Sequence, residues 1–132
     1  FLLGKKVPLH GGGHSVRSFI HISDVADGTL RAAREGRPGD IFHLSTSRTI
    51  SIRSLVELIA KQMGVSFEKN VDVVEDRPGK DAAYLLDSSK AKKELGWSDK
   101  IGLEEGIEET IAWVKSNLGT LEKEPLSYIH KQ

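Results

Sequence analysis

The sequence predicts a mixed α/β domain, and three observations support this class. Short apolar runs of strand length alternate with amphipathic helical segments along most of the 132 residues. Glycines and Pro-Gly turns separate these segments. The first two predicted strands lie close together, so the pattern is neither a regular series of βαβ units nor a helical bundle. A chain of this length is expected to form one domain.

The first third of the chain is predicted to contain two strands and a helix. Val7–Leu9 has the length of a short strand, and the run Gly11-Gly12-Gly13 ends it. From Val16 to Ile22, the side chains alternate between two faces, as they do in a strand. Ser23 is the expected N-cap of the following helix, which Gly36 ends.

The middle of the chain is predicted to contain a turn, a strand and a helix. The turn covers Arg37–Asp40, and a short strand is expected over Ile41–Leu44. Ser51 is the expected cap of an amphipathic helix that ends at Gly64. The apolar residues of this helix recur at spacings of three and four: Ile52, Leu55, Val56, Ile59 and Met63.

The last third is predicted to contain a strand, a charged turn and two helices. The strand covers Val71–Val74, and the turn covers residues 76–81. A short helix follows a cap at Asp87, Ser88 or Ser89 and stops at Gly96. The final helix has one apolar face, made of Leu103, Ile107, Ile111, Val114 and Leu118. We therefore expect a domain over residues 1–118 and a polar, irregular tail over 119–132.

The composition excludes several classes of function. The chain has 19 basic and 19 acidic residues, so no general field attracts nucleic acid or an anionic membrane, and neither is an expected partner. It has no cysteine, which excludes a disulfide framework and a thiolate zinc site and is typical of a cytoplasmic protein. The start at Phe1 lacks an initiator Met and the order of a signal peptide, so we expect a longer chain.

The glycine run does not fit the known phosphate-binding loops. A dinucleotide-binding turn needs Gly-x-Gly-x-x-Gly between a strand and a helix, whereas here His14 and a predicted strand follow the glycines. A turn between two strands is therefore predicted. His10 and His14 are four residues apart, but this spacing aligns two imidazoles only on a helix. We predict two solvent-facing loop histidines and no metal site.

Two arginines are candidates for binding an anion. Arg17 lies in an apolar strand, where a partly covered guanidinium needs an anionic partner. The partner is either a carboxylate, such as that of Asp24 or Asp40, or a ligand phosphate; the residues alone favour the ion pair. Arg77 precedes Pro78-Gly79, and a rigid loop suits bidentate recognition of a phosphate. The residues alone favour an exposed surface loop there.

Four stretches carry a resemblance that covers most of the chain, from about residue 5 to residue 118. They read VPLHGGGHSVRSFIHISDVADG, GDIFHLSTSRTISIRSLVELIAKQMG, EDRPGKDAAYLLDSSKAKKELGW and LEEGIEETIAWV. In this order they resemble the C-terminal part of the extended short-chain dehydrogenase/reductase family. The resemblance is strongest to its dTDP-glucose 4,6-dehydratases and related NAD-dependent epimerases. It implies the mixed α/β, substrate-binding part of an extended Rossmann-type enzyme.

The resemblance implies a binding site for a nucleoside-diphosphate sugar. Arg17 and Arg77 match the arginines that bind the pyrophosphate in this family. The resemblance therefore favours phosphate binding over an ion pair for Arg17, and over an exposed surface loop for Arg77. His43 stands where the family usually has Asn in Tyr-Asn-Ile-Gly, and its imidazole can still donate a hydrogen bond. The remaining residues expected at the ligand are Pro8 and Leu9 beside the base, and Asp76, Pro78, Gly79 and Lys80.

The resemblance also implies what this chain lacks. The family holds NAD in a glycine-rich turn and transfers protons with a Tyr-x-x-x-Lys pair, both upstream of this segment. Ser88 stands four residues after Tyr84, and Gln132 four residues after Tyr128, so neither tyrosine has the lysine. No catalytic, cofactor-binding or metal-binding residue is therefore expected here, and the segment alone is expected to be inactive.

Several functions follow from the resemblance. The full-length protein is expected to be a homodimeric, NAD-dependent nucleotide-sugar 4,6-dehydratase. Such an enzyme oxidises the sugar at C4, eliminates water across C5 and C6, and returns the hydride to C6. A UDP-sugar 4-epimerase or decarboxylase of the same family is the alternative. A non-catalytic nucleotide-binding module is the alternative from another class.

Overall fold

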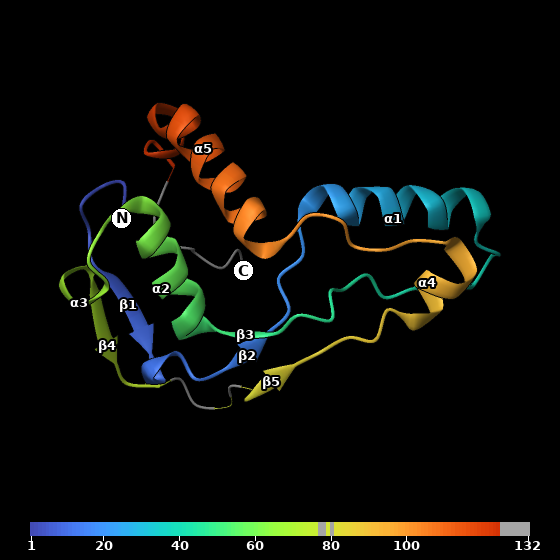
Figure 1. Cartoon of the computed structure of the whole chain (residues 1–132), viewed down its shortest axis with the longest axis horizontal. Coiled ribbons are helices and arrows are strands. Elements are labelled where there is room, and N and C mark those ends of the chain that lie inside the picture. The colour runs from blue at the N-terminus through green and yellow to red at the C-terminus, as the bar shows by residue number, and fades with distance from the viewer. Residues whose placement is uncertain (77–78, 80, 125–132) are drawn as a thin grey trace, which may run out of the picture.

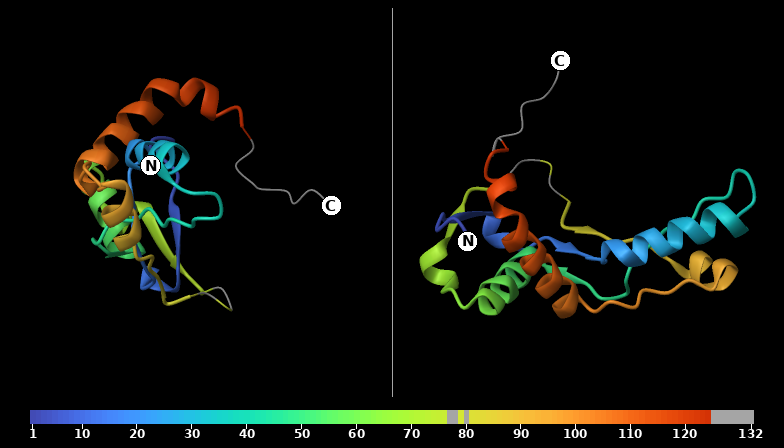
Figure 2. Two further views of the ribbon diagram at one scale, coloured as in Figure 1. Left: turned by 90° about the vertical axis from the view of Figure 1, so that its right-hand side faces the viewer. Right: turned by 90° about the horizontal axis from the view of Figure 1, so that it is seen from above.

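Two groups of elements, joined by a narrow strip of three short strands, make up the fold (Figure 1). The computed structural model describes residues 1–76, 79 and 81–124. Figure 1 and the right-hand view of Figure 2 show that the first helix and the short fourth helix lie at one end, apart from the other long helices. The molecule is therefore elongated, and each group has its own small core.

The first group is built on a parallel pair of strands. β1 (Val7–His10) pairs with β4 (Val71–Val74), with His10 opposite Val74. The helices of this group are α2 (Ile52–Met63), the short α3 (Phe67–Asn70) and α5 (Leu103–Leu121). Leu9, Ala60 and Val71 are buried and form its core. The predicted strands at Val7–Leu9 and Val71–Val74 are confirmed.

The connecting strip has β2 (Val16–Arg17) at its centre. β3 (Ile50–Ser51) pairs with it antiparallel, and β5 (Ala83–Tyr84) pairs with it in parallel. The predicted strand over Val16–Ile22 was therefore too long, because both partners of β2 are only two residues long. The strip matters for function because it places Arg17 between the two groups.

The second group packs around a buried tryptophan. α1 (Ile22–Glu35) and α4 (Ser89–Leu95) lie beside each other, and Trp97, which is 1% exposed, packs with Ala91 and Leu95. The Trp97 indole Nε1 donates a hydrogen bond of 2.8 Å to the Asp24 carbonyl oxygen. The side chains that pack against this cluster are Ile20, Ala32, Phe42 and Leu44.

Asp24 joins this second group to the helix of the first. Its side chain is buried, and one carboxylate oxygen accepts hydrogen bonds of 3.0 Å from the backbone N–H groups of Lys100 and Ile101. A buried carboxylate is stable only when such donors satisfy it. Asp24 therefore fixes the segment that leads into α5.

Helix α1 begins differently from the prediction. Its N-cap is His21 rather than Ser23, because the His21 Nδ1 accepts a hydrogen bond of 3.3 Å from the Ser23 backbone N–H. The imidazole thus takes the place that a hydroxyl or carboxylate usually fills at a helix N-terminus. The predicted end at Gly36 is confirmed, as are the cap of α2 at Ser51 and its end at Gly64.

The predicted strand at Ile41–Leu44 is wrong. This segment forms no ladder with any strand in the described part of the chain. Phe42 and Leu44 do turn toward the Trp97 cluster, which explains the apolar pattern, while Ile41 is 73% exposed. At the other end of the chain, α5 continues to Leu121, past the expected start of the irregular tail at Gly119.

A surface ion pair links the loop before β3 to α5 and makes stability depend on pH. Arg48 binds both carboxylate oxygens of Glu104, and this hydrogen bonding lowers the Glu104 pKa from 4.5 to about 2. Lys90, with help from Arg37, likewise lowers the Asp40 pKa from 3.8 to about 2. Each carboxylate holds its proton less tightly in the folded chain than in the unfolded chain.

We expect the folded chain to lose stability as the pH falls from about 4.5 to about 2. Protons bind preferentially to the unfolded chain in this window, so both contributions are present above it and lost within it. Melting curves recorded at successive pH values test this. The variant Glu104→Gln should be less stable at neutral pH and lose less stability on acidification, because the contribution of the Glu104 carboxylate is then absent. An equal pH dependence in both proteins would contradict the role of Glu104.

Candidate functional site

Some of the predicted site residues lie at or beside one edge of the parallel pair. β1 and β4 point the same way, so the residues that follow His10 and Val74 leave the pair at a common edge. The short 3-10 turn η1 (Gly11–Gly13) follows β1 there, and Glu75 and Asp76 follow β4; the sequence from residue 75 to residue 82 is called the loop over residues 75–82 below. Ligands of α/β proteins bind at the carboxyl ends of parallel strands, so this edge is the candidate site.

The glycine run packs between this loop and α2. All three glycines have positive φ angles, which are unfavourable for other residues. A β-carbon on Gly11 would overlap the carboxyl group of Asp76. A β-carbon on Gly13 would stand 2.8 Å from the backbone N of Arg53 in α2. The predicted turn between two strands is confirmed, and its glycines allow this close packing.

The two histidines beside the glycines differ from each other. His14 is exposed, as predicted. His10 belongs to β1, is only partly exposed, and its Nδ1 lies 3.1 Å from the Glu75 carbonyl oxygen. His10 is therefore not a solvent-facing loop histidine, and it holds the beginning of the loop. In the described ranges, no three His, Cys, Asp or Glu side chains are close enough to hold a metal ion.

The far end of the loop is bound to β2 and the residue before it. The hydroxyl of Ser15 and the Nη2 of Arg17 each donate a hydrogen bond of 3.1 Å to the Asp81 carbonyl oxygen. The Val16 backbone N–H donates one of 2.9 Å to the Ala82 carbonyl oxygen. Glu75 on one side of residues 77–80, and Asp81 and Ala82 on the other, are thus all bonded to the segment from His10 to Arg17.

Arg17 does not form the ion pair that the residues alone favoured. Its Nη1 donates to the Val16 carbonyl oxygen at 2.8 Å, and its Nη2 to that of Asp81. Asp24 accepts backbone N–H groups instead, and Asp40 pairs with Lys90 and Arg37. Within the described residues, no carboxylate lies within ion-pair distance of Arg17. Its guanidinium keeps an uncompensated charge and unused donors, which suits an anionic ligand.

The other predicted ligand residues divide into three sets. Pro8 and Gly79 are exposed, and Asp76 lies against Gly11. The Leu9 side chain is 2% exposed and belongs to the core, which leaves its backbone for a ligand. Three others, Arg77, Pro78 and Lys80, lie outside the described residues.

His43 lies apart from this edge. It is exposed in the segment beside the Trp97 cluster, in the second group of elements. The Asp87 pKa is lowered chiefly by hydrogen bonds from Ser89, and a smaller Coulombic effect comes from His43. The structure therefore brings Arg17 and the loop over residues 75–82 together, but it places His43 beside Asp87.

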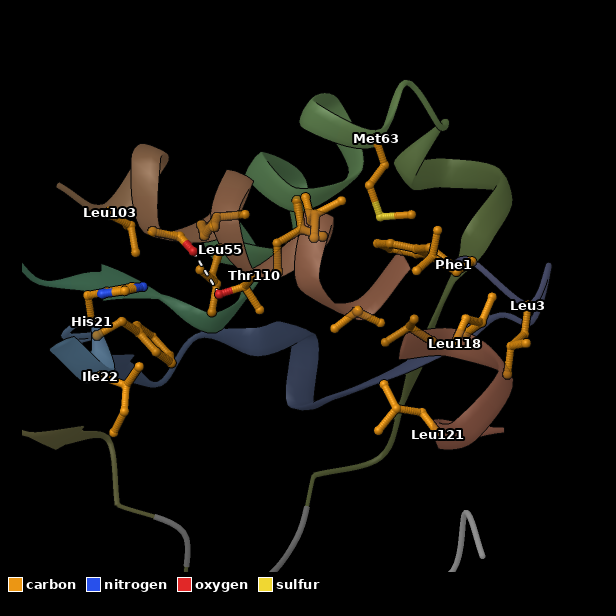
Figure 3. Close-up of a pocket in the computed structure, with 18 of the residues that line it drawn as sticks. Phe1, Leu3, His21, Ile22, Leu55, Met63, Leu103, Thr110, Leu118 and Leu121 are labelled. Carbon is orange, nitrogen blue, oxygen red and sulfur yellow. Dashed lines mark hydrogen bonds between the residues drawn. The ribbon is translucent and has the colours of Figure 1, made fainter. Parts of the chain in front are cut away.

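A large apolar groove runs along α5, and the sequence did not predict it. Its volume is about 810 Å³ (Figure 3). Phe1, Met63 and Leu118 lie near one end, and Leu103 and His21 near the other. None of the α5 residues is buried, although the helix has a regular apolar face. The apolar residues that line the groove come mainly from α2 and α5: Leu55, Ile59, Met63, Leu103, Ile107, Ile111, Val114, Leu118 and Leu121.

Comparison with known proteins identifies the family. Residues 1–110 match the family described as GDP-mannose 4,6 dehydratase. The chain belongs to this family. The match confirms the resemblance to extended short-chain dehydrogenases/reductases, and the fold confirms the expected mixed α/β class. No helix in the described ranges is long and apolar enough to cross a membrane.

Curated relatives of this family match the chain over about a third of their own length. A dTDP-glucose 4,6-dehydratase of Streptomyces antibioticus is 38% identical over 114 residues, which are 86% of this chain and 34% of the relative. The dTDP-D-glucose 4,6-dehydratase of Homo sapiens is 35% identical over 118 residues, which are 86% of this chain and 33% of the relative. The chain therefore spans about a third of the length of these relatives.

Solved structures of such dehydratases, and of an epimerase, have the same fold. A double mutant of a dTDP-glucose 4,6-dehydratase from Streptomyces venezuelae, solved with NAD bound, superposes with a TM-score of 0.88 at 31% identity; the match covers 92% of this chain and 38% of that one. A UDP-glucose 4-epimerase from Thermotoga maritima, solved with UDP-glucose, superposes with a TM-score of 0.81 at 31% identity; the match covers 89% of this chain and 37% of that one.

Proposed function

We propose that this chain is the substrate-binding part of an NAD-dependent nucleotide-sugar 4,6-dehydratase of the dTDP-glucose type. The observation that carries the proposal is the uncompensated guanidinium of Arg17 beside a loop that is held at both ends. The names of the relatives support the reaction class, and the loop contains the DRPG motif with Arg77. The ligand is a nucleoside-diphosphate sugar.

In this proposal the two arginines bind the diphosphate from neighbouring segments. Arg17 comes from β2, and Arg77 from the loop that β2 holds at Asp81. A planar guanidinium suits bidentate contact with phosphate oxygens. Binding the diphosphate, which does not react, orients the sugar for chemistry elsewhere in the enzyme. Pro8, the Leu9 backbone and Gly79 border the same ligand. His43, which lies apart from this edge in the second group of elements, is proposed only as a second-tier contact and not as a ligand of the diphosphate.

The residues of this chain do not fit an NAD site. The sequence contains no glycine-rich dinucleotide turn and no Tyr-x-x-x-Lys pair, so the proposal assigns NAD to the rest of a longer polypeptide. When bound there, NAD accepts a hydride from the sugar and returns it. The task of this chain is to bind and orient the substrate, and no metal ion is part of the proposal.

Two surfaces suit contact with that NAD-binding part of the same polypeptide. The groove along α5 presents apolar side chains that nothing in the described chain covers. The segment Ile41–Leu44 offers strand-forming residues that pair with no strand of the described residues. Relatives are about three times as long as this chain, which leaves ample sequence for such a partner.

We also propose that the complete protein is a homodimer, which sedimentation measurements can test.

A UDP-sugar 4-epimerase or decarboxylase is the second candidate. It is favoured by the similar superposition of the Thermotoga maritima UDP-glucose 4-epimerase. The two reactions differ in the product, so the complete protein should be incubated with dTDP-glucose and with UDP-glucose. A 4-keto-6-deoxy sugar supports the dehydratase, and a C4 epimer supports the epimerase. Tight binding of nucleotide sugars without turnover by the complete protein supports the non-catalytic module and refutes the enzyme.

The 132-residue chain alone should catalyse none of these reactions. It lacks the cofactor turn and the proton-transfer pair, so it has no means of moving a hydride. Product analysis with NAD and each nucleotide sugar measures this directly. NAD should also bind no better than another diphosphate in a calorimetric titration. Turnover, or tight and selective NAD binding, by the purified chain would contradict the proposal that NAD is bound by the rest of a longer polypeptide.

A further inference from the structure

The contact between Gly11 and Asp76 joins two residues that are far apart in sequence. Gly11 directly follows β1, and Asp76 stands two residues after β4. The parallel register, with His10 opposite Val74, brings them to the same edge. Asp76 is the last described residue before Arg77, so its position decides where the loop begins.

The side of Gly11 that lacks a β-carbon is occupied by the Asp76 carboxyl group. A β-carbon built there would overlap the carboxyl carbon and both oxygens of Asp76. An aspartate side chain has only two torsions, so its carboxylate cannot leave this place without losing its contacts or moving the backbone of the loop. Gly11 also has a φ angle of +56°, which other residues rarely adopt.

The charge of Asp76 argues against direct binding of a diphosphate. A carboxylate beside a diphosphate raises the free energy of the complex by repulsion between like charges. In its place against Gly11, the same carboxylate holds the start of the loop, while Ser15 and Arg17 hold the end at Asp81. The sequence assigned Asp76 to the ligand, whereas this geometry gives it a different task.

We infer that Gly11 and Asp76 are a positioning pair for the substrate loop. Asp76 packs against the bare Gly11, which fixes the backbone position that Arg77 follows in the sequence, and neither residue needs to touch the reacting sugar. This inference rests on the proposed function. It adds that the glycine run contributes to substrate affinity because Gly11 leaves room for Asp76. The run does not itself bind the phosphates.

The variant Gly11→Ala, made in the complete polypeptide, tests the pair. The KM for the nucleotide sugar should rise roughly three- to tenfold while kcat changes little, because the loop is displaced but the reacting groups are not. Gly64→Ala is the matched control. Gly64 has a φ angle of +67°, close to that of Gly11, but nothing lies within 4 Å of its added β-carbon. It should lower the melting temperature comparably and leave KM unchanged.

A double-mutant cycle tests the contact itself. Asp76→Ala alone should raise KM. In the double variant, Gly11→Ala should raise KM little further, because the added β-carbon no longer meets a carboxylate that it would displace. Fully additive effects would overturn the pair, as would a wild-type KM in Gly11→Ala. Hydrogen exchange gives a readout that is independent of activity. Amides of residues 75–83 should exchange faster in Gly11→Ala than in Gly64→Ala, and equal exchange would refute the pair even if the complete protein proved to have another activity.

Discussion

Replacing Trp97 with alanine should lower the free energy of unfolding by about 3–5 kcal/mol. Its indole is 1% exposed and is the largest fully buried side chain. It is the centre of the second core, where it contacts α4 and the side chains of Phe42 and Leu44. The substitution leaves a cavity and removes the indole N–H that donates to the Asp24 carbonyl oxygen. Asp24 also binds the backbone of the segment before α5 through its carboxylate.

Urea unfolding of the chain, followed by circular dichroism, measures this effect. Trp113→Ala is the matched control, because Trp113 lies on α5 and is 59% exposed. It should change the free energy of unfolding by less than about 1 kcal/mol. Equal effects of the two substitutions would show that the Trp97 cluster is not a distinct core. Loss of only a part of the cooperative transition would show that the two groups unfold separately.

The elements that sequence predicted well are those whose ends are specified locally. Helix α2 has a hydroxyl cap at Ser51, an apolar stripe and a glycine end at Gly64, and the structure has the same three features. The start of α1 was missed because a histidine accepts the capping hydrogen bond, and histidine is not among the usual capping residues. The segment Ile41–Leu44 has the composition of a strand, but composition cannot show whether a partner strand is present.

The sequence proposed residues for the candidate site, and their role in binding a ligand stays a prediction; their contacts could not be predicted. The resemblance indicated Arg17 and the residues around Asp76; the structure places Asp76 at the edge of the β1–β4 pair and joins Arg17, from β2, to Asp81 further along the same segment. The partners of Arg17 are carbonyl oxygens, which every residue has, so no sequence pattern distinguishes them. The packing of Asp76 against Gly11 joins positions 65 residues apart, and only the parallel register reveals it.

The proposed function predicts that Arg17→Ala and Arg77→Ala, made in the complete protein, should each weaken nucleotide-sugar binding roughly tenfold to a hundredfold. A hydrogen bond from a charged group contributes about 1.5–3 kcal/mol, and each factor of ten corresponds to about 1.4 kcal/mol. The rate of the bound chemistry should change much less, because the diphosphate lies away from the carbons that react. Lysine at either position should restore binding only in part, since it lacks the planar guanidinium.

A structural role for Arg17 predicts a different result, and three variants separate the two. Arg17 also donates to the Asp81 carbonyl oxygen, so its loss loosens the loop as well as removing a charge. Ser15→Ala removes the other side-chain donor to that oxygen without changing the charge. Arg34→Ala, at the exposed end of α1, removes an equal charge away from the site.

Binding isotherms and melting curves on these variants decide between the two roles. If Arg17 binds the diphosphate, Arg17→Ala should lose far more affinity than Ser15→Ala, and Arg34→Ala should bind normally. If its role is only to anchor the loop, Arg17→Ala and Ser15→Ala should lose similar affinity and similar stability. An unchanged affinity in Arg17→Ala together with a lower melting temperature would refute the phosphate assignment, because an uncompensated guanidinium within reach of a diphosphate cannot leave its binding energy unaffected.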